Sequence, residues 1–265
     1  MEIVGYIASL LIGISLGLIG GGGSILTVPV MVYLFGLQPL LATSYSLFIV
    51  GSTSLFGAYT NFRKGLVNIK AALLFGASSI VTVFLTRKYI LPFIPKDIIT
   101  IGSVNITEEL LTMVLFAVLM LLASISMIRS RKVGVEEKEC RDCIRFGKLV
   151  LYGIVIGLVT GFLGAGGGFL LIPALVLLLK LPMKKAIGTS LMIIALNSLI
   201  GFTGDLGHFL IDWSFLLKIT AIAVTGIFIG GALSKKIPGD KLKKGFGWFV
   251  LVMGIYILVK ETILK

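Results

Sequence analysis

The chain contains the same glycine-rich segment twice, and the two copies are 144 residues apart. Residues 17–29 read GLIGGGGSILTVP, and residues 161–173 read GFLGAGGGFLLIP. The match resumes at the same separation in residues 54–57 and 198–201, which read SLFG and SLIG. Each glycine cluster interrupts an otherwise apolar stretch. A hydrophobic unit that occurs twice and is interrupted at the same place in both halves is typical of secondary transporters.

The composition indicates an integral membrane protein. The chain is 57% hydrophobic and 14% charged, with a mean hydropathy of +1.09, whereas soluble domains carry about 25% charged residues. A bilayer crossing needs about 20 apolar residues, and stretches of about this size recur along the whole chain. The candidate spans are 40–62, 66–86, 110–128, 186–204, 213–234 and 246–259, together with the glycine-interrupted segments 3–36 and 149–179. The sequence therefore predicts an all-α, polytopic membrane protein.

The net charge of +12 does not indicate a nucleic-acid partner, because the basic residues lie in the short gaps between apolar runs. Basic gaps face the cytoplasm. By this rule the linker 130–147 and the lysine-rich turns 180–185 and 235–244 lie inside, and the turn between those two, with Asp205, His208 and Asp212, lies outside. Segment 149–179 must then enter and leave on the same side.

A hairpin bent at the glycine cluster satisfies this topology. A continuous helix over 149–179 would be about 46 Å long, against a hydrocarbon core of about 30 Å. By the repeat, segment 3–36 forms the equivalent hairpin from the outside. Each half then has a glycine-bent hairpin plus three transmembrane helices. Because these five segments are an odd number, the second half is inverted in the membrane relative to the first. We therefore expect ten helical segments in two inverted-topology repeats, 1–129 and 148–265, joined by the basic cytoplasmic linker 130–147, with both termini outside.

The glycine bends could also form an anion-binding site. The second arm of each hairpin begins just after its glycines, and a helix start carries unpaired N–H groups and a partial positive charge. Glycine lets a ligand approach the backbone closely. Thr-Ser pairs follow each cluster and could donate hydroxyl hydrogen bonds. The predicted substrate-binding residues are Gly21, Gly22, Gly23, Ser24, Thr43, Ser44, Ala165, Gly166, Gly167, Gly168, Thr189 and Ser190. The alternatives are that the glycines only permit close helix packing and that the hydroxyls bond to the preceding helical turn.

Few charged residues are candidates for ion coupling or for attracting an anion. They are Lys64, Asp205, His208, Asp212 and Lys218. The lysines could equally extend towards the membrane surface, and the histidine with its two aspartates could be a plain exterior turn. Because Arg63, Arg87 and Arg129 all lie at the ends of candidate spans, we expect anion binding without a dedicated arginine.

The two cysteines, Cys140 and Cys143, form a C-x-x-C motif in the linker. One such motif without a nearby histidine does not complete a zinc site. The thiols are a redox pair, half of a four-thiolate site in a dimer, or two solvated thiols, and the sequence leaves these alternatives open.

The doubled glycine cluster with Pro29 and Pro173, the Ala42-Thr-Ser44 and Gly188-Thr-Ser190 motifs and the basic central linker resemble the sulfite exporter TauE/SafE family of membrane transporters. The resemblance covers about residues 3–260. It implies transport of sulfite, sulfoacetate, thiosulfate or another small organosulfur anion.

The leading hypothesis is thus a multi-pass secondary transporter in the cytoplasmic (inner) membrane that moves a small sulfur-containing oxyanion. The alternatives are an anion channel and a thiol or sulfur relay that uses Cys140 and Cys143. No Walker-type nucleotide loop and no hydrolase or metalloprotease motif is present in the sequence. We therefore expect no enzyme, cofactor or metal site; the expected partners are a small anion and the bilayer, and the oligomeric state stays open.

Overall fold

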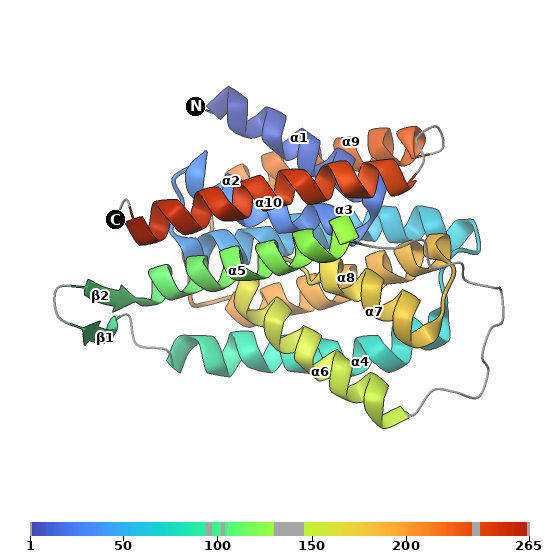
Figure 1. The fold of residues 1–265 in the computed structure, drawn as a ribbon, viewed down its shortest axis with the longest axis horizontal. Helices are drawn as coiled ribbons and strands as arrows, with labels where there is room; N and C mark the ends of the chain where they lie inside the picture. Colours follow the sequence, from blue (N-terminus) through green and yellow to red (C-terminus); the bar gives the residue numbers. More distant parts are fainter. Residues whose placement is uncertain (1, 94–96, 102–103, 130–145, 235–238, 264–265) are drawn as a thin grey trace.

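The computed structural model describes residues 2–93, 97–101, 104–129, 146–234 and 239–263, and this part of the chain forms ten α-helices (Figure 1). The helices are α1 Glu2–Ile19, α2 Thr27–Tyr33, α3 Pro39–Arg63, α4 Ile69–Leu85, α5 Glu108–Arg129, α6 Phe146–Leu163, α7 Gly168–Leu179, α8 Met183–Asp205, α9 Trp213–Leu233 and α10 Gly239–Ile263. Four described helical spans are long and apolar enough to cross a membrane, namely Pro39–Arg63, Ile69–Phe93, Met183–Asp205 and Trp213–Leu233. The predicted polytopic helical fold is confirmed.

Short elements complete the described chain. A 3₁₀ helix, η1 (Gly21–Leu26), joins α1 to α2. A π-helical turn, η2 (Thr86–Ile90), and a 3₁₀ turn, η3 (Leu91–Phe93), continue α4. The polar segment that follows contains an antiparallel pair of strands, β1 (Asp97–Ile101) and β2 (Val104–Thr107). The linker with Cys140 and Cys143 lies outside the described residues.

Both glycine-rich segments are broken where the sequence predicted. The first helix ends before Gly20, whose φ is 75°, and the second ends before Gly164, whose φ is 66°. Only glycine adopts such left-handed angles at little cost. After the first break the chain folds back. The evidence is that the ring centroids of Tyr6, near the start of α1, and Phe35, just beyond α2, lie 6.0 Å apart. The arms α6 and α7 likewise run from their break towards the same end of the molecule (Figure 1).

Helices α3 and α8 form the centre of the molecule and run antiparallel. Within an apolar stretch of 18 residues in each of these two helices, 67% of the residues are buried, against 39% in the corresponding stretches of the spans that contain α4 and α9. A Cβ added to Gly51 would touch Leu199, and one added to Gly57, further along α3, would touch Leu191, earlier in α8. The two helices with equivalent positions in the repeat therefore face each other in opposite directions.

The other helix contacts also occur in pairs that exchange the two halves. Helix α1 packs on α9 where the Gly13 side of α1 meets the backbone of Ala223. Helix α6 packs on α4 where Gly157 meets the backbone of Ser79. Each residue of one contact differs by 144 from a residue of the other (157 minus 13, and 223 minus 79). The separation seen in the sequence therefore relates equivalent contacts in space.

Two hydrogen bonds at the starts of α4 and α9 obey the same relation. Asn68 and Asp212 are the N-cap residues of these helices, and each caps its own helix through its side chain. The backbone N–H of Asn68 donates to the hydroxyl of Thr189 (2.9 Å), and that of Asp212 donates to the hydroxyl of Tyr45 (2.7 Å). Tyr45, which is 144 residues before Thr189, is thus its spatial equivalent. Thr43 is 146 residues before Thr189, so the two Thr-Ser pairs are two residues out of register with the repeat.

Candidate functional site

The two glycine clusters meet inside the molecule. Gly21 in η1 and Gly168 at the start of α7 lie backbone to backbone, and a Cβ on either would overlap the main chain of the other. Both residues are buried. The side chain of Ile194 from α8 also lies against Gly21. The predicted binding segments of the two halves are therefore brought together next to the central helix pair.

The second cluster leaves main-chain N–H donors unpaired at the start of a helix. Gly164, Gly166 and Gly167 have φ values of 66°, 65° and 64°, and Ala165 lies between them. Gly167 is the N-cap of α7 and provides no side-chain cap. The N–H groups of Ala165, Gly166 and Gly167 have no partner among the described residues. Ser198 of α8 reaches Gly166, and its buried hydroxyl also lacks a partner in this part of the chain.

The first cluster is more self-contained. Gly21, Gly22, Gly23 and Ser24 all belong to η1, and the Ser24 hydroxyl donates to the carbonyl of Gly21 at 2.8 Å. The two clusters therefore differ in local structure, as their different sequences suggest.

Most of the predicted hydroxyl donors are already engaged. Thr43 donates to the carbonyl of Leu40 (2.7 Å), and Thr189 and Ser190 donate to the carbonyls of residues 185 (2.7 Å) and 187 (2.9 Å). These bonds to the preceding turn are the alternative that the sequence left open for them. Ser44 differs, because its buried hydroxyl has no partner among the described residues.

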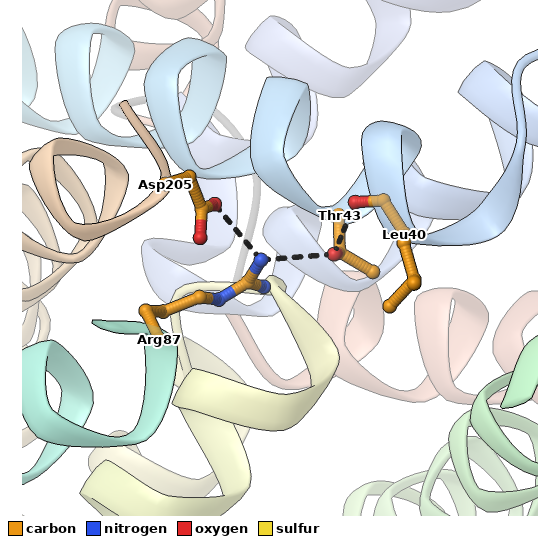
Figure 2. Close-up of polar contacts among 4 residues, drawn as sticks. All are labelled: Leu40, Thr43, Arg87 and Asp205. Carbon is orange, nitrogen blue, oxygen red and sulfur yellow. Dashed lines mark hydrogen bonds and ion pairs between the residues drawn. The ribbon is translucent and has the colours of Figure 1, made fainter. Parts of the chain in front are cut away.

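A buried ion pair adjoins the second glycine bend (Figure 2). The Nη1 atom of Arg87 lies 3.0 Å from Oδ2 of Asp205 and donates to the hydroxyl of Thr43 at 3.1 Å. The exposed fractions of the arginine and aspartate side chains are 0% and 2%. The main chain of Thr43 contacts Gly164, and Thr86 contacts Gly161, so this cluster touches the end of α6 and the bend that follows.

Only one edge of this guanidinium is used. The Nε and Nη2 atoms of Arg87 are buried and have no partner in the described part of the chain. They carry three of the five N–H donors of an arginine. A buried donor without a partner costs about 1–3 kcal/mol, so the arrangement leaves polar groups that a ligand or water would stabilise.

The expectation that no arginine lies inside a span is wrong. Arg87 lies within the apolar helical span Ile69–Phe93, in the π-helical turn η2. The span predicted from the sequence, 66–86, ends just before Arg87 and Lys88, which are both basic. The apolar run continues beyond them as Tyr-Ile-Leu-Pro-Phe, and this continuation was the signal that could have placed Arg87 in the interior.

The remaining charged candidates lie elsewhere. Asp205 is buried, but Lys64, His208, Asp212 and Lys218 are exposed on the protein surface. Lys64 follows the last residue of α3, and Asp212 caps α9. Among the described residues, no group of three or more histidine, cysteine, aspartate and glutamate side chains could hold a metal ion. The structure thus brings Asp205 alone of these five next to a glycine bend.

The chain is similar to known proteins over most of its length. The family model described as "Sulfite exporter TauE/SafE" matches residues 6–257. A "Probable membrane transporter protein" from Xylella fastidiosa strain 9a5c is 30% identical over 252 residues, which cover 94% of this chain and 91% of the relative. The "Probable membrane transporter protein YdhB" from Bacillus subtilis is 26% identical, with 94% and 96% covered. No solved structure matches the chain significantly.

Proposed function

The chain belongs to the sulfite exporter TauE/SafE family of membrane transporters, and we propose that it moves a small sulfur-containing oxyanion, such as sulfite or an organosulfonate, across the cytoplasmic membrane. The proposed mechanism is secondary transport by alternating access. The observation that carries the proposal is the contact between Gly21 and Gly168, which joins the glycine breaks of both halves in the protein interior.

The chemistry of this contact region favours an anion. Unpartnered N–H groups precede α7, and an aligned helix start adds a partial positive charge. In a hydrocarbon environment each unsatisfied backbone group costs several kcal/mol, so these donors need partners. A sulfur oxyanion offers several acceptor oxygens on one small, compact group. The proposed site consists of residues 21–24 and 165–168, with Ser44 and Ser198 beside it.

The arrangement of the halves supports alternating access. In the proposed topology the two repeats have opposite orientations in the bilayer, which agrees with the antiparallel packing of α3 and α8. Two equivalent halves that share one central site can exchange roles, so that each opens the site to its own side of the membrane. The basic turns at 180–185 and 235–244, which both face the cytoplasm, set the orientation in this proposal.

Reconstitution in proteoliposomes tests the function. Vesicles that contain the purified protein are loaded with unlabelled sulfite and diluted into a trace of ³⁵S-sulfite. We expect transient accumulation of label against its gradient, because a carrier exchanges one bound anion for another. Uptake that follows the gradient without counterflow would indicate a channel instead. The absence of uptake of sulfite, thiosulfate and sulfoacetate would contradict the proposal.

A further inference from the structure

Arg87 presents an unused hydrogen-bonding edge in the protein interior. Its Nη1 group is held by Asp205 and Thr43, whereas Nε and Nη2 have no partner among the described residues. The side chain is fully buried. Buried polar groups in proteins are almost always satisfied, so the free edge of an arginine whose other edge is fixed is suited to bind a ligand.

The surroundings of Arg87 hold the guanidinium beside the glycine bend. Its Cβ packs against Gly204 of α8, where an added methyl group would come within 3.1 Å. Thr43, which accepts one of its hydrogen bonds, contacts Gly164 directly. The main-chain donors of Ala165 to Gly167 follow this contact point within three residues. Side-chain and main-chain donors are thus grouped at one bend.

The internal repeat shows that the fold does not require an ion pair at this place. At a separation of 144, the equivalent of Arg87 is Gly231 and the equivalent of Asp205 is Asn61. Asn61 donates to the carbonyl of Gly57 in its own helix, and the space beside Gly231 holds no atom within 4 Å of an added Cβ. The second copy of the framework is therefore built without the charged pair, which is a feature of one side only.

We propose that the Nε–Nη2 edge of Arg87 is the anchor for the transported anion and binds two oxygens of one sulfite or sulfonate group. This inference rests on the proposed function and names the binding residue of the same transporter. Two parallel N–H donors in a fixed plane match two oxygens of an oxyanion, which a halide cannot offer. Asp205 and Thr43 act as positioning residues, because they hold Nη1 and so fix the plane of the guanidinium.

The test compares three variants by isothermal titration of the purified protein in detergent with sodium sulfite, methanesulfonate or chloride. Arg87→Lys keeps the charge but loses the planar fork, and we expect sulfite and methanesulfonate to bind about tenfold more weakly or worse. Lys88→Gln is the matched control, since Lys88 is the neighbouring residue but is exposed. It should bind both oxyanions like the wild type. Chloride should bind far more weakly than either oxyanion to the wild-type protein.

The double variant Arg87→Gln/Asp205→Asn covers the case in which Arg87→Lys does not fold, because it leaves no unpaired buried charge. It should unfold near the wild-type temperature and show no measurable binding of methanesulfonate. If the wild type binds sulfite and a folded Arg87 variant binds it within twofold as tightly, the inference is overturned and the proposed function stands. If the wild type neither binds nor transports any of the oxyanions, both fall.

Discussion

Gly21 and Gly168 lie main chain against main chain although 147 residues separate them in the sequence. Each is the first residue of the short helix that follows its glycine break. The contact places the ends of two hairpins, one from each half of the chain, at one point.

Replacing Gly168 by alanine should impair both stability and transport. The added methyl group would overlap the Gly21 main chain, which cannot rotate away as a side chain could. Overpacking of this kind costs about 1–3 kcal/mol. We expect a lower unfolding temperature and little counterflow. The control is Gly231→Ala, where nothing lies within 4 Å and where alanine favours the helix by about 1 kcal/mol. Equal behaviour of the two variants would show that the contact has no role.

The orientation of the two repeats can be tested by labelling. In a variant with both cysteines replaced by serine, single cysteines are introduced at Gln38, before α3, and at Lys184, in the first turn of α8. Both positions are exposed. An impermeant maleimide should label position 38 from outside intact cells and position 184 only after permeabilisation. Labelling of both positions from one side would exclude inverted repeats.

The equivalent hydroxyls of Tyr45 and Thr189 should stabilise the protein without binding substrate. Each accepts a backbone N–H at the start of a neighbouring helix. Tyr45→Phe and Thr189→Val should each lower the free energy of unfolding by about 1 kcal/mol, the usual contribution of one hydrogen bond. Sulfite affinity, measured by titration, should not change. A large loss of affinity in folded Thr189→Val would restore Thr189 to the binding site.

The exposed lysines should contribute little to anion affinity. Lys64 and Lys218 are both exposed and do not lie at a glycine bend, and a long lysine side chain can extend its charge to the membrane surface. Lys64→Ala and Lys218→Ala should therefore change sulfite binding less than about threefold, because a charge at the surface contributes little to a buried site. Elimination of binding by either substitution in a folded protein would identify a lysine as the main anchor.

The cysteine pair should be dispensable for transport. Because Cys140 and Cys143 lie in a polar basic linker, we expect Cys140→Ser/Cys143→Ser to retain wild-type counterflow of sulfite. Complete loss of transport in a variant that reaches the membrane would favour the thiol-relay alternative.

The sequence alone determined the number of helices and the two breaks in them. The helical segments follow from apolar runs long enough to enter or cross the bilayer. The breaks follow from consecutive glycines, because glycine allows backbone angles that interrupt a helix locally. The separation of 144 residues, read from the sequence, also relates the contacts Gly13–Ala223 and Gly157–Ser79. These properties depend on residues near one another in the chain or on the repeat itself.

Only the tertiary structure decided which polar residues share the interior. The sequence placed Arg87 at a helix end, because a basic pair usually marks the membrane surface. In the fold, Asp205 from α8 and Thr43 from α3 lie within hydrogen-bonding distance of its guanidinium and pair with it in the interior. A buried charge needs its partner in three dimensions, and no local pattern encodes that partner, which here is 118 residues away.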